Sequence, residues 1–420
     1  MLSLITPLLL IFLALLIVAI FIHLYLKLPA NITILFLAGP LVSISAPIMV
    51  FIGSIVSSKM ASDASFATLP LGLMVAGTAS ATIPAAMLAK KVGRRWASII
   101  GFNAALIGSL IAGFAVISHS FMTFCSAAYI IGLSTAFTQQ LRFAAIESVN
   151  NDSDINKALS VLMFAGIFSA MIGPEIALLG KTLFANTLGF AAPFYGISLL
   201  SVVSMLLMLK FKNTDIAELE SSQNPRPLLT IIKQPIFIVA VLAAALSYGL
   251  MSYIMTSTPL SMHQVHHHSL AETKWVIQSH IAAMFLPSLI TTWLSQKIGL
   301  KNLLLIGSTV FAVVLIIATQ GHSVLHYWWA LILLGVAWNF LFFAGTSLLH
   351  FSYRADEKHK VQAINDFSVF TFQGASSLMA GWVLFNYGWS GVIISAIPFV
   401  LVMFAVSLYY YIKLQRYIHN

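Results

Sequence analysis

The chain has 420 residues, of which 60% are hydrophobic and 8% are charged, and its formal net charge is +9. Soluble domains carry roughly 25% charged residues, so this composition excludes a water-soluble protein. The cations are spread over many segments, which excludes a nucleic-acid-binding surface and favours membrane topology as the origin of the charge. The single cysteine, Cys125, excludes an internal disulfide and a cysteine-based metal site.

The first half of the chain contains seven predicted membrane helices, each close to the about 20 residues that cross a bilayer. Residues 4–26 lack the basic start and the cleavage site of a signal peptide, so they predict an extra membrane helix. In the next span, residues 31–57, Pro40 and Pro47 predict kinks. The following predicted spans are 68–89, 97–118, 121–144, 158–184 and 190–210.

A polar, charged and proline-bearing stretch separates the two halves and predicts a linker over residues 212–231. The second half has six predicted spans: 235–259, 274–296, 301–319, 327–350, 361–386 and 389–412. We therefore predict an all-α integral membrane protein with an extra helix (1–30), a six-helix bundle (31–211), a cytoplasmic linker (212–231) and a second six-helix bundle with a short tail (232–420).

One basic loop fixes the expected orientation of these spans. Four cations surround Gly93, and such loops lie on the cytoplasmic side of membranes: Lys90, Lys91, Arg94 and Arg95. Of the 21 cations, all but Lys59, Lys181 and Lys274 then fall on the cytoplasmic side. A weaker copy of the loop, Trp293 to Lys301 with Gly299, recurs about half a chain later, which predicts two halves of one architecture. The N-terminus is expected outside and the C-terminus in the cytoplasm.

Twelve spans in two sixes, a central linker and a basic loop after the second span of each half resemble the Major Facilitator Superfamily. The loop motif of that family is matched at Gly93, Arg94 and Arg95, whereas Lys90 stands in place of an aspartate and Ala86 in place of a glycine. The resemblance implies a secondary transporter that alternates access around a central site, with Lys90, Lys91, Gly93, Arg94 and Arg95 at a cytoplasmic gate.

A second stretch resembles the Gly-Pro motif of the proton-coupled drug antiporters in that family. It runs from Ser169 to Ala177 around Gly173 and Pro174, with two of the usual glycines replaced by Ser169 and Ala177. The antiporters' arginine motif in the fourth span is not matched, because Ala128 occupies its position. The motif implies export, but a packing face of small residues explains the same pattern.

Polar side chains in the spans are the candidate substrate site. Thr135, Gln139 and Arg142 share one face of the fourth span. The resemblance implies that the first, fourth, seventh and tenth spans line the cavity, which adds Tyr248, Ser252, Trp338, Asn339 and Thr346. A guanidinium beside amides suits a carboxylate, so an anionic or zwitterionic solute is expected. The alternative is that Arg142 pairs with Glu147 near the cytoplasmic end and faces water.

Proton coupling is expected, because ionisable groups inside spans are costly and there is no phosphate-binding loop for ATP. Only two of the 12 acids lie in predicted spans, Glu175 and Asp366, and His280 joins them. For Glu175 the alternative is a structural carboxylate bonded to a neighbouring helix, and for His280 a neutral ring bonded across helices. Lys90 or Lys91 is expected to pair with Asp366, Asp356 or Glu357 when the cytoplasmic side is closed, the alternative being helix capping and solvated charges.

The outer loop between the seventh and eighth spans contains His263, His266, His267 and His268. A pH-sensitive polar loop is favoured over a metal site, because no cysteine or well-placed carboxylate completes a ligand set. No metal or cofactor is expected. The protein is expected to be a non-enzymatic monomer of a bacterial-type inner membrane, whose partners are a small solute, protons and lipid. The alternatives are a drug or lipophilic-cation:proton antiporter and a membrane-embedded enzyme or lipid-handling protein.

Overall fold

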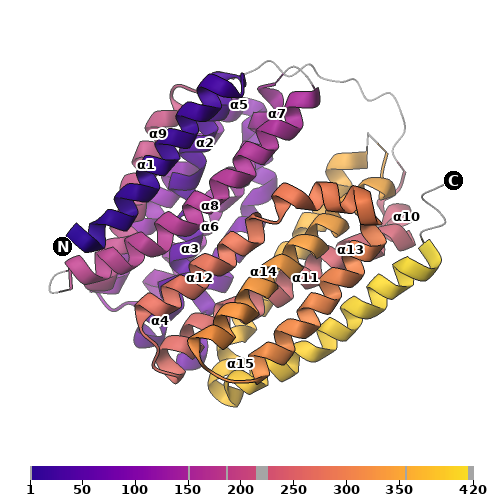
Figure 1. Ribbon diagram of the computed structural model, residues 1–420. Helices are drawn as coiled ribbons and strands as arrows, with labels where there is room; N and C mark the ends of the chain where they lie inside the picture. The colour runs from indigo at the N-terminus through magenta and orange to yellow at the C-terminus, as the bar shows by residue number, and fades with distance from the viewer. Residues whose placement is uncertain (1, 150–151, 186–187, 214–225, 355–356, 415–420) are drawn as a thin grey trace. The chain divides into compact units, whose positions relative to one another are not determined.

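The computed structural model describes residues 2–149, 152–185, 188–213, 226–354 and 357–414 (Figure 1). Every regular element in these ranges is a helix. Ten helical segments are long and apolar enough to cross a membrane, the first of them near the N-terminus. The all-α, multi-pass membrane architecture is therefore confirmed.

The chain divides into two compact units. The first comprises residues 1–216 together with 269–278, and the second comprises 217–268 together with 279–420. The helices of the first unit are α1 (Leu2–Tyr25), α2 (Ala30–Ser43), α3 (Ser45–Ile48), α4 (Ser54–Met60), α5 (Leu69–Ile117), α6 (Phe121–Gln139), α7 (Leu141–Glu147), α8 (Asp152–Leu183) and α9 (Ala192–Met208), with short turns η1 (Met49–Gly53), η2 (Ala64–Phe66) and η3 (Gly189–Ala191).

The helices of the second unit are α10 (Leu228–Ile232), α11 (Pro235–Leu260), α13 (Ser288–Thr319), α14 (Val324–Leu349) and α15 (Lys358–Tyr409), with short turns η4 (Ser261–Val265), η5 (His350–Ser352) and η7 (Tyr410–Leu414). Helix α12 (Leu270–Phe285) begins in the first unit and ends in the second. Helix α10 forms where the predicted linker ends, so the end of that stretch is helical.

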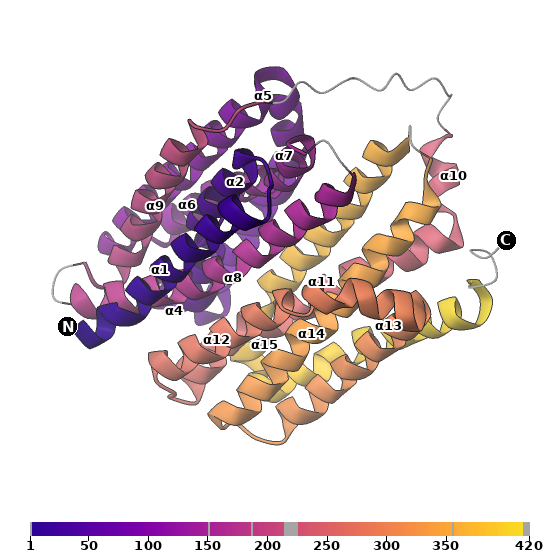
Figure 2. The same cartoon turned by 45° about the horizontal axis from the view of Figure 1, so that its top comes forward.

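The predicted extra helix is present as α1, which packs on α2 and α8 and lies along α8 in both views (Figure 2). Its outer face is apolar and strongly exposed, with Leu10, Ile17 and Leu24 each more than half exposed. A bilayer solvates such a face, so this surface is consistent with a membrane helix at the edge of the first unit. Lys27 adopts a positive φ in the turn between α1 and α2.

Helix α5 continues through the basic loop, and a single residue breaks its geometry. Gly93 has φ 80° and ψ 161°, a conformation that is essentially restricted to glycine. Gly299 breaks α13 with φ 80° and ψ 156°, and Gly388 breaks α15 between the predicted spans 361–386 and 389–412. The segments 64–117 and 360–413 each have 54 residues, more than twice the about 20 residues that one crossing needs.

The kink predicted at Pro47 is confirmed as a helix end. Proline has no N–H to donate to the carbonyl four residues earlier, which here belongs to Ser43, and α2 ends at Ser43. The chain continues as α3 and a π-helical turn before α4. Pro40, by contrast, lies inside α2 without ending it. The predicted span 31–57 is therefore a helix with two interruptions, at which the backbone keeps right-handed helical dihedral angles.

Candidate functional site

The basic loop of the first unit is held by a bidentate ion pair. Arg94 donates from Nε to Glu147 Oε2 (2.8 Å) and from Nη2 to Glu147 Oε1 (2.5 Å), and its Nη1 donates to Gln140 Oε1 (3.1 Å). Glu147 ends α7, so the pair ties the loop to the fourth predicted span. Arg94 is thus a partner of Glu147, for which the sequence had suggested Arg142.

Gly93 makes this loop compact. The backbone N–H of Arg95 donates to Asn213 Oδ1 (2.9 Å), and a Cβ at Gly93 would lie 2.3 Å from Asn213 Nδ2. Lys90 and Lys91 are exposed on the same loop. Of the expected partners for these lysines, Asp356 lies outside the described residues. The pairing of Lys90 or Lys91 with Asp366 stays a prediction.

A small polar cavity of about 170 Å³ lies in the first unit, lined by Ser43, Ser45, Ala46, Thr135, Thr138 and Gln139. Thr135 and Gln139 belong to the predicted substrate set. Ser43 and Ser45 flank the break between α2 and α3, which brings two hydroxyl-bearing residues of the first predicted span to the fourth. The sequence analysis did not include either serine among the candidate site residues. Pro47 was the signal that could have drawn attention to them, because it indicates an interruption of the helix at this point.

Arg142, the remaining member of the fourth-span set, lies on α7. Its side chain is exposed, and its guanidinium carbon is 4.8 Å from the centre of the Phe143 ring. Such a contact stabilises a cation through the electrons of the ring, whereas an anion is bound by the N–H groups of a guanidinium. The role of Arg142 in binding an anion stays a prediction.

An aromatic cluster in the second unit joins α11 to α14. The Trp338 and Phe342 rings are stacked with centroids 5.2 Å apart, and Tyr248 meets them edge-on at 5.2 and 5.3 Å. Tyr248 and Trp338 belong to the predicted substrate set, whereas Phe342 does not. Tyr248 and Phe342 are half-buried at the edge of a small core around Ala244 and Val369.

Unsatisfied polar atoms occur on the helices of this cluster. Among the described residues, Trp338 Nε1 and the hydroxyls of Ser252 and Thr256 are buried and have no hydrogen-bond partner. Leaving a buried donor unsatisfied costs about 1–3 kcal/mol, so a ligand or water is expected to supply the partner. The cluster therefore combines packed aromatic rings with buried polar groups on the same helices.

Asn339, also in the predicted substrate set, is fully used within the second unit. Its Nδ2 donates to Met284 O (2.8 Å) and Ser288 Oγ (2.7 Å), and its Oδ1 accepts from Thr291 (2.8 Å). These partners flank the break between α12 and α13 at Pro287. Asn339 therefore connects α14 to the ends of α12 and α13, a structural role that the sequence did not indicate. Thr346 is exposed and bonds to the Phe342 carbonyl.

The three ionisable candidates for proton coupling have different surroundings. Glu175 on α8 is buried and forms an ion pair with Lys274 on α12, with Oε1 2.5 Å from Nζ. This is the bond to a neighbouring helix that the sequence left open. His280 is fully buried, and its Nδ1 donates to the Leu331 carbonyl (2.7 Å), which leaves Nε2 without a partner among the described residues. Asp366 is half-buried and accepts from Asn365 (3.2 Å).

The outer-loop histidines are joined by a histidine that the sequence did not single out. The His266 ring stacks on His322 with centroids 4.0 Å apart, and His268 Nε2 donates to the His322 carbonyl (2.6 Å). Burial and the nearby imidazoles of His266, His326 and His268 lower the pKa of His322. No group of three or more metal-binding side chains occurs within the described ranges.

A second bidentate pair lies at the other end of the second unit. Arg226 donates from Nε and Nη2 to Glu357 (2.7 and 2.6 Å), and the Arg226 and Arg354 backbone N–H groups donate to the same carboxylate (both 2.9 Å). Arg226 holds the pKa of Glu357 at about 2. Glu357 was expected to meet Lys90 or Lys91, but its carboxylate is occupied by the end of the predicted linker.

Comparison with known proteins gives concordant matches over most of the chain. The family model described as Major Facilitator Superfamily matches residues 34–271 and 240–418. The chain is 32% identical to the riboflavin transporter RfnT of Brucella anthropi over 361 residues, 86% of this chain and 90% of that protein. It is 27% identical over 384 residues to the uncharacterized MFS-type transporter YddS of Bacillus subtilis, covering 87% of each. YdeG of the same organism is 29% identical, covering 80% of this chain and 81% of that protein.

Proposed function

Because this chain belongs to the Major Facilitator Superfamily, we propose that it is a secondary active transporter that moves a small organic solute by alternating access. The family consists of carriers, so the expectation of a non-enzymatic protein is confirmed. The breaks at Gly93, Gly299 and Gly388 support the proposal of twelve core spans after α1, because each lies between two predicted spans. We place the protein in a bacterial-type inner membrane with its C-terminus in the cytoplasm.

The proposed substrate is a planar heteroaromatic solute with polar edges, of the kind that riboflavin represents. The observation that carries this proposal is the cluster of Tyr248, Trp338 and Phe342, with the Trp338 indole N–H buried and unsatisfied. Stacking of a base on an aromatic side chain contributes about 1–3 kcal/mol, and the indole N–H adds a directional bond. The riboflavin transporter among the relatives supports the same class.

A second candidate substrate is an anionic or zwitterionic solute. Arg142 supports it, because the guanidinium is exposed and backed by Phe143. The polar cavity beside Thr135 and Gln139 has room for a few atoms of a ligand. A carboxylate would be bound by two parallel N–H donors of the guanidinium.

Proton coupling is proposed through Asp366 and His280. The Nε2 atom of His280 is an acceptor without a partner among the described residues, so it can receive a proton without first breaking a bond. Asp366 is half-buried in a span. Protonation of Glu175 would break its ion pair with Lys274. In the cytoplasmic gate we propose that Lys90 pairs with Asp366, for which Lys90→Asp with a compensating Asp366→Lys is the test.

Equilibrium binding to the purified protein tests the substrate class. Riboflavin and a panel of carboxylates are titrated against the wild type, Trp338→Phe, Trp338→Ala and Arg142→Gln. Trp329→Phe on the exposed side of α14 is the matched control. Loss of the N–H in Trp338→Phe should weaken riboflavin binding about tenfold, and Trp338→Ala should weaken it further.

The outcomes distinguish the two candidate substrates. Carboxylate binding that disappears in Arg142→Gln and is unchanged in the Trp338 variants would support the anionic solute. Riboflavin binding with equal affinity in Trp338→Ala and wild type would reject the aromatic cluster as its site.

A further inference from the structure

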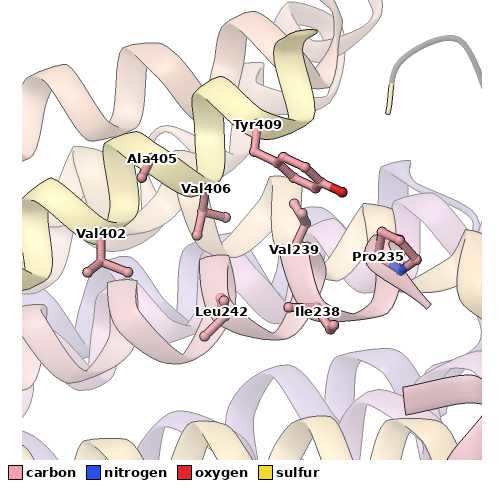
Figure 3. A pocket seen from close by; sticks show the side chains of 8 residues that line it. All are labelled: Pro235, Ile238, Val239, Leu242, Val402, Ala405, Val406 and Tyr409. Carbon is pink, nitrogen blue, oxygen red and sulfur yellow. The ribbon is translucent and has the colours of Figure 1, made fainter. Parts of the chain in front are cut away.

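An apolar groove lies between α11 and α15 in the second unit, separate from the aromatic cluster. Its volume is about 420 Å³, within the range of about 300–1,000 Å³ typical of ligand pockets. Figure 3 shows the side chains of the two helices converging on it, with Leu242 and Val402 toward one end and Pro235 and Tyr409 at the other. The full lining is Pro235, Ile238, Val239, Leu242, Val402, Ala405, Val406 and Tyr409.

The chemistry of the lining excludes a polar solute. Apart from the Tyr409 hydroxyl, every lining side chain is hydrocarbon, so a polar solute would lose its bonds to water without replacement. The rim is open, since Ile238, Val402 and Tyr409 are each more than two-fifths exposed. Exposed apolar side chains on membrane-spanning helices face hydrocarbon. A lipid acyl chain is the occupant that matches both properties.

Lysine side chains lie at the end of the groove where the headgroup of such a lipid would lie. Lys233 precedes α11 by two residues and is exposed beside Pro235, and Lys413 lies on η7, one turn beyond Tyr409. The turn η7 packs against α11, so both lysines belong to the same end of the groove. Lys301 reaches this end as well, because its Nζ is 5.0 Å from the centre of the Tyr411 ring on η7.

We propose that this groove is a binding site for an anionic phospholipid. One acyl chain occupies the channel from Tyr409 to Val402, and the phosphate lies against Lys233 and Lys413. Basic pockets at the ends of membrane helices recognise acidic headgroups, and each lysine near the surface contributes about fivefold in affinity. Tyr409 marks the interface between the acyl chain and the headgroup, where aromatic residues with a polar tip are enriched.

The test is native mass spectrometry of the full-length protein titrated with phosphatidylglycerol and, separately, phosphatidylcholine of the same acyl composition. Val402→Trp fills the groove, and Leu401→Trp is the matched control, because Leu401 is exposed on the same helix but does not line the groove. The surface variant Lys233→Gln/Lys413→Gln removes the headgroup contacts, with Lys210→Gln in the first unit as its control.

Phosphatidylglycerol is expected to bind more tightly than phosphatidylcholine, with a loss of about thirtyfold in the double lysine variant. Val402→Trp should abolish the bound lipid and Leu401→Trp should retain it. If Val402→Trp and Leu401→Trp retain equal amounts of bound lipid, the groove is not the lipid-binding site. Equal affinity for the two lipids, with no effect of the lysines, would overturn the anionic headgroup. A dimer that displaces lipid from the wild type would assign the groove to a second copy of the chain instead.

Discussion

The turns at Gly93 and Gly299 have the same backbone and different surroundings. Both glycines have φ 80°, with ψ 161° and 156°. At Gly93 the neighbouring Arg94 forms a bidentate pair with Glu147, and Asn213 fills the space beside the glycine. At Gly299 nothing lies within 4 Å of the position that a Cβ would take, and Lys297 lies over the Trp293 ring instead. The glycine is therefore the feature that the two turns share. The ion pair between Arg94 and Glu147 is a property of the first unit.

The largest expected loss of stability comes from removing the ion pair between Arg94 and Glu147. Arg94→Ala leaves the Glu147 carboxylate without its cation in a largely buried place, which should lower the free energy of unfolding by about 3 kcal/mol. Lys297→Ala, the matched change at the other turn, should cost about 0.5 kcal/mol. Thermal unfolding in detergent measures both. In Arg94→Ala/Glu147→Ala the loss should be smaller than the sum of the single losses. Equal losses at the two turns would contradict the asymmetry.

The glycines themselves give the next effect. Gly299→Ala places a Cβ on a backbone that favours glycine and should cost about 1 kcal/mol, whereas Gly93→Ala should cost about 2 kcal/mol because the Cβ also displaces Asn213. The added Asn213→Ala change should remove the difference between the two sites. If Gly299→Ala proves the more damaging substitution, the strain at these turns has another origin.

The second unit has its own bidentate pair, between Arg226 and Glu357, and this pair should be sensitive to acid. The pKa of Glu357 is about 2 in the folded protein, below the ordinary 4.5, so the pair stabilises the fold above pH 4.5 and loses this contribution as the pH falls from 4.5 to 2. Glu357→Gln should lower the melting temperature at pH 7 and make little difference near pH 2. A difference in melting temperature between wild type and Glu357→Gln that stays constant from pH 7 to pH 2 would contradict this role of the ion pair.

The smallest effect is expected at the outer histidines. The pKa of His322 is lowered, so its neutral form favours the folded state and the stability it supports decreases as the pH falls below 6.5. His322→Gln should therefore reduce the change in melting temperature between pH 7.5 and pH 5.5. His119→Gln in the first unit is the control. A wild type whose melting temperature is flat over this interval would contradict this role of the stack with His266.

The turns were predictable because they depend on local sequence. Gly93 and Gly299 stand in recurring basic loops, and Pro47 indicates the end of α2 by removing one backbone donor. The choice of Tyr248 and Trp338 as cavity residues came from the family resemblance, and it stays a prediction. Such features need only the order of residues along one helix.

The partners were not predictable, because they depend on long-range packing. Arg94 and Glu147 lie 53 positions apart, and Arg226 and Glu357 lie 131 apart. From the charge pattern, Arg142 was considered for Glu147, and Lys90 or Lys91 for Glu357. Asn339 similarly resembled a ligand residue, and only the fold places Met284 and Ser288 beside it. The identity of a buried polar group's partner is fixed by the fold and leaves no local signal.

The most direct measurement is riboflavin flux into proteoliposomes that contain the purified chain, with and without a pH gradient. We predict saturable uptake that the gradient accelerates, that Trp338→Ala reduces at least about fivefold, and that Trp329→Ala leaves unchanged. Saturable flux of a carboxylate but not of riboflavin, or riboflavin flux that Trp338→Ala leaves at the wild-type rate, would contradict the proposed aromatic substrate site.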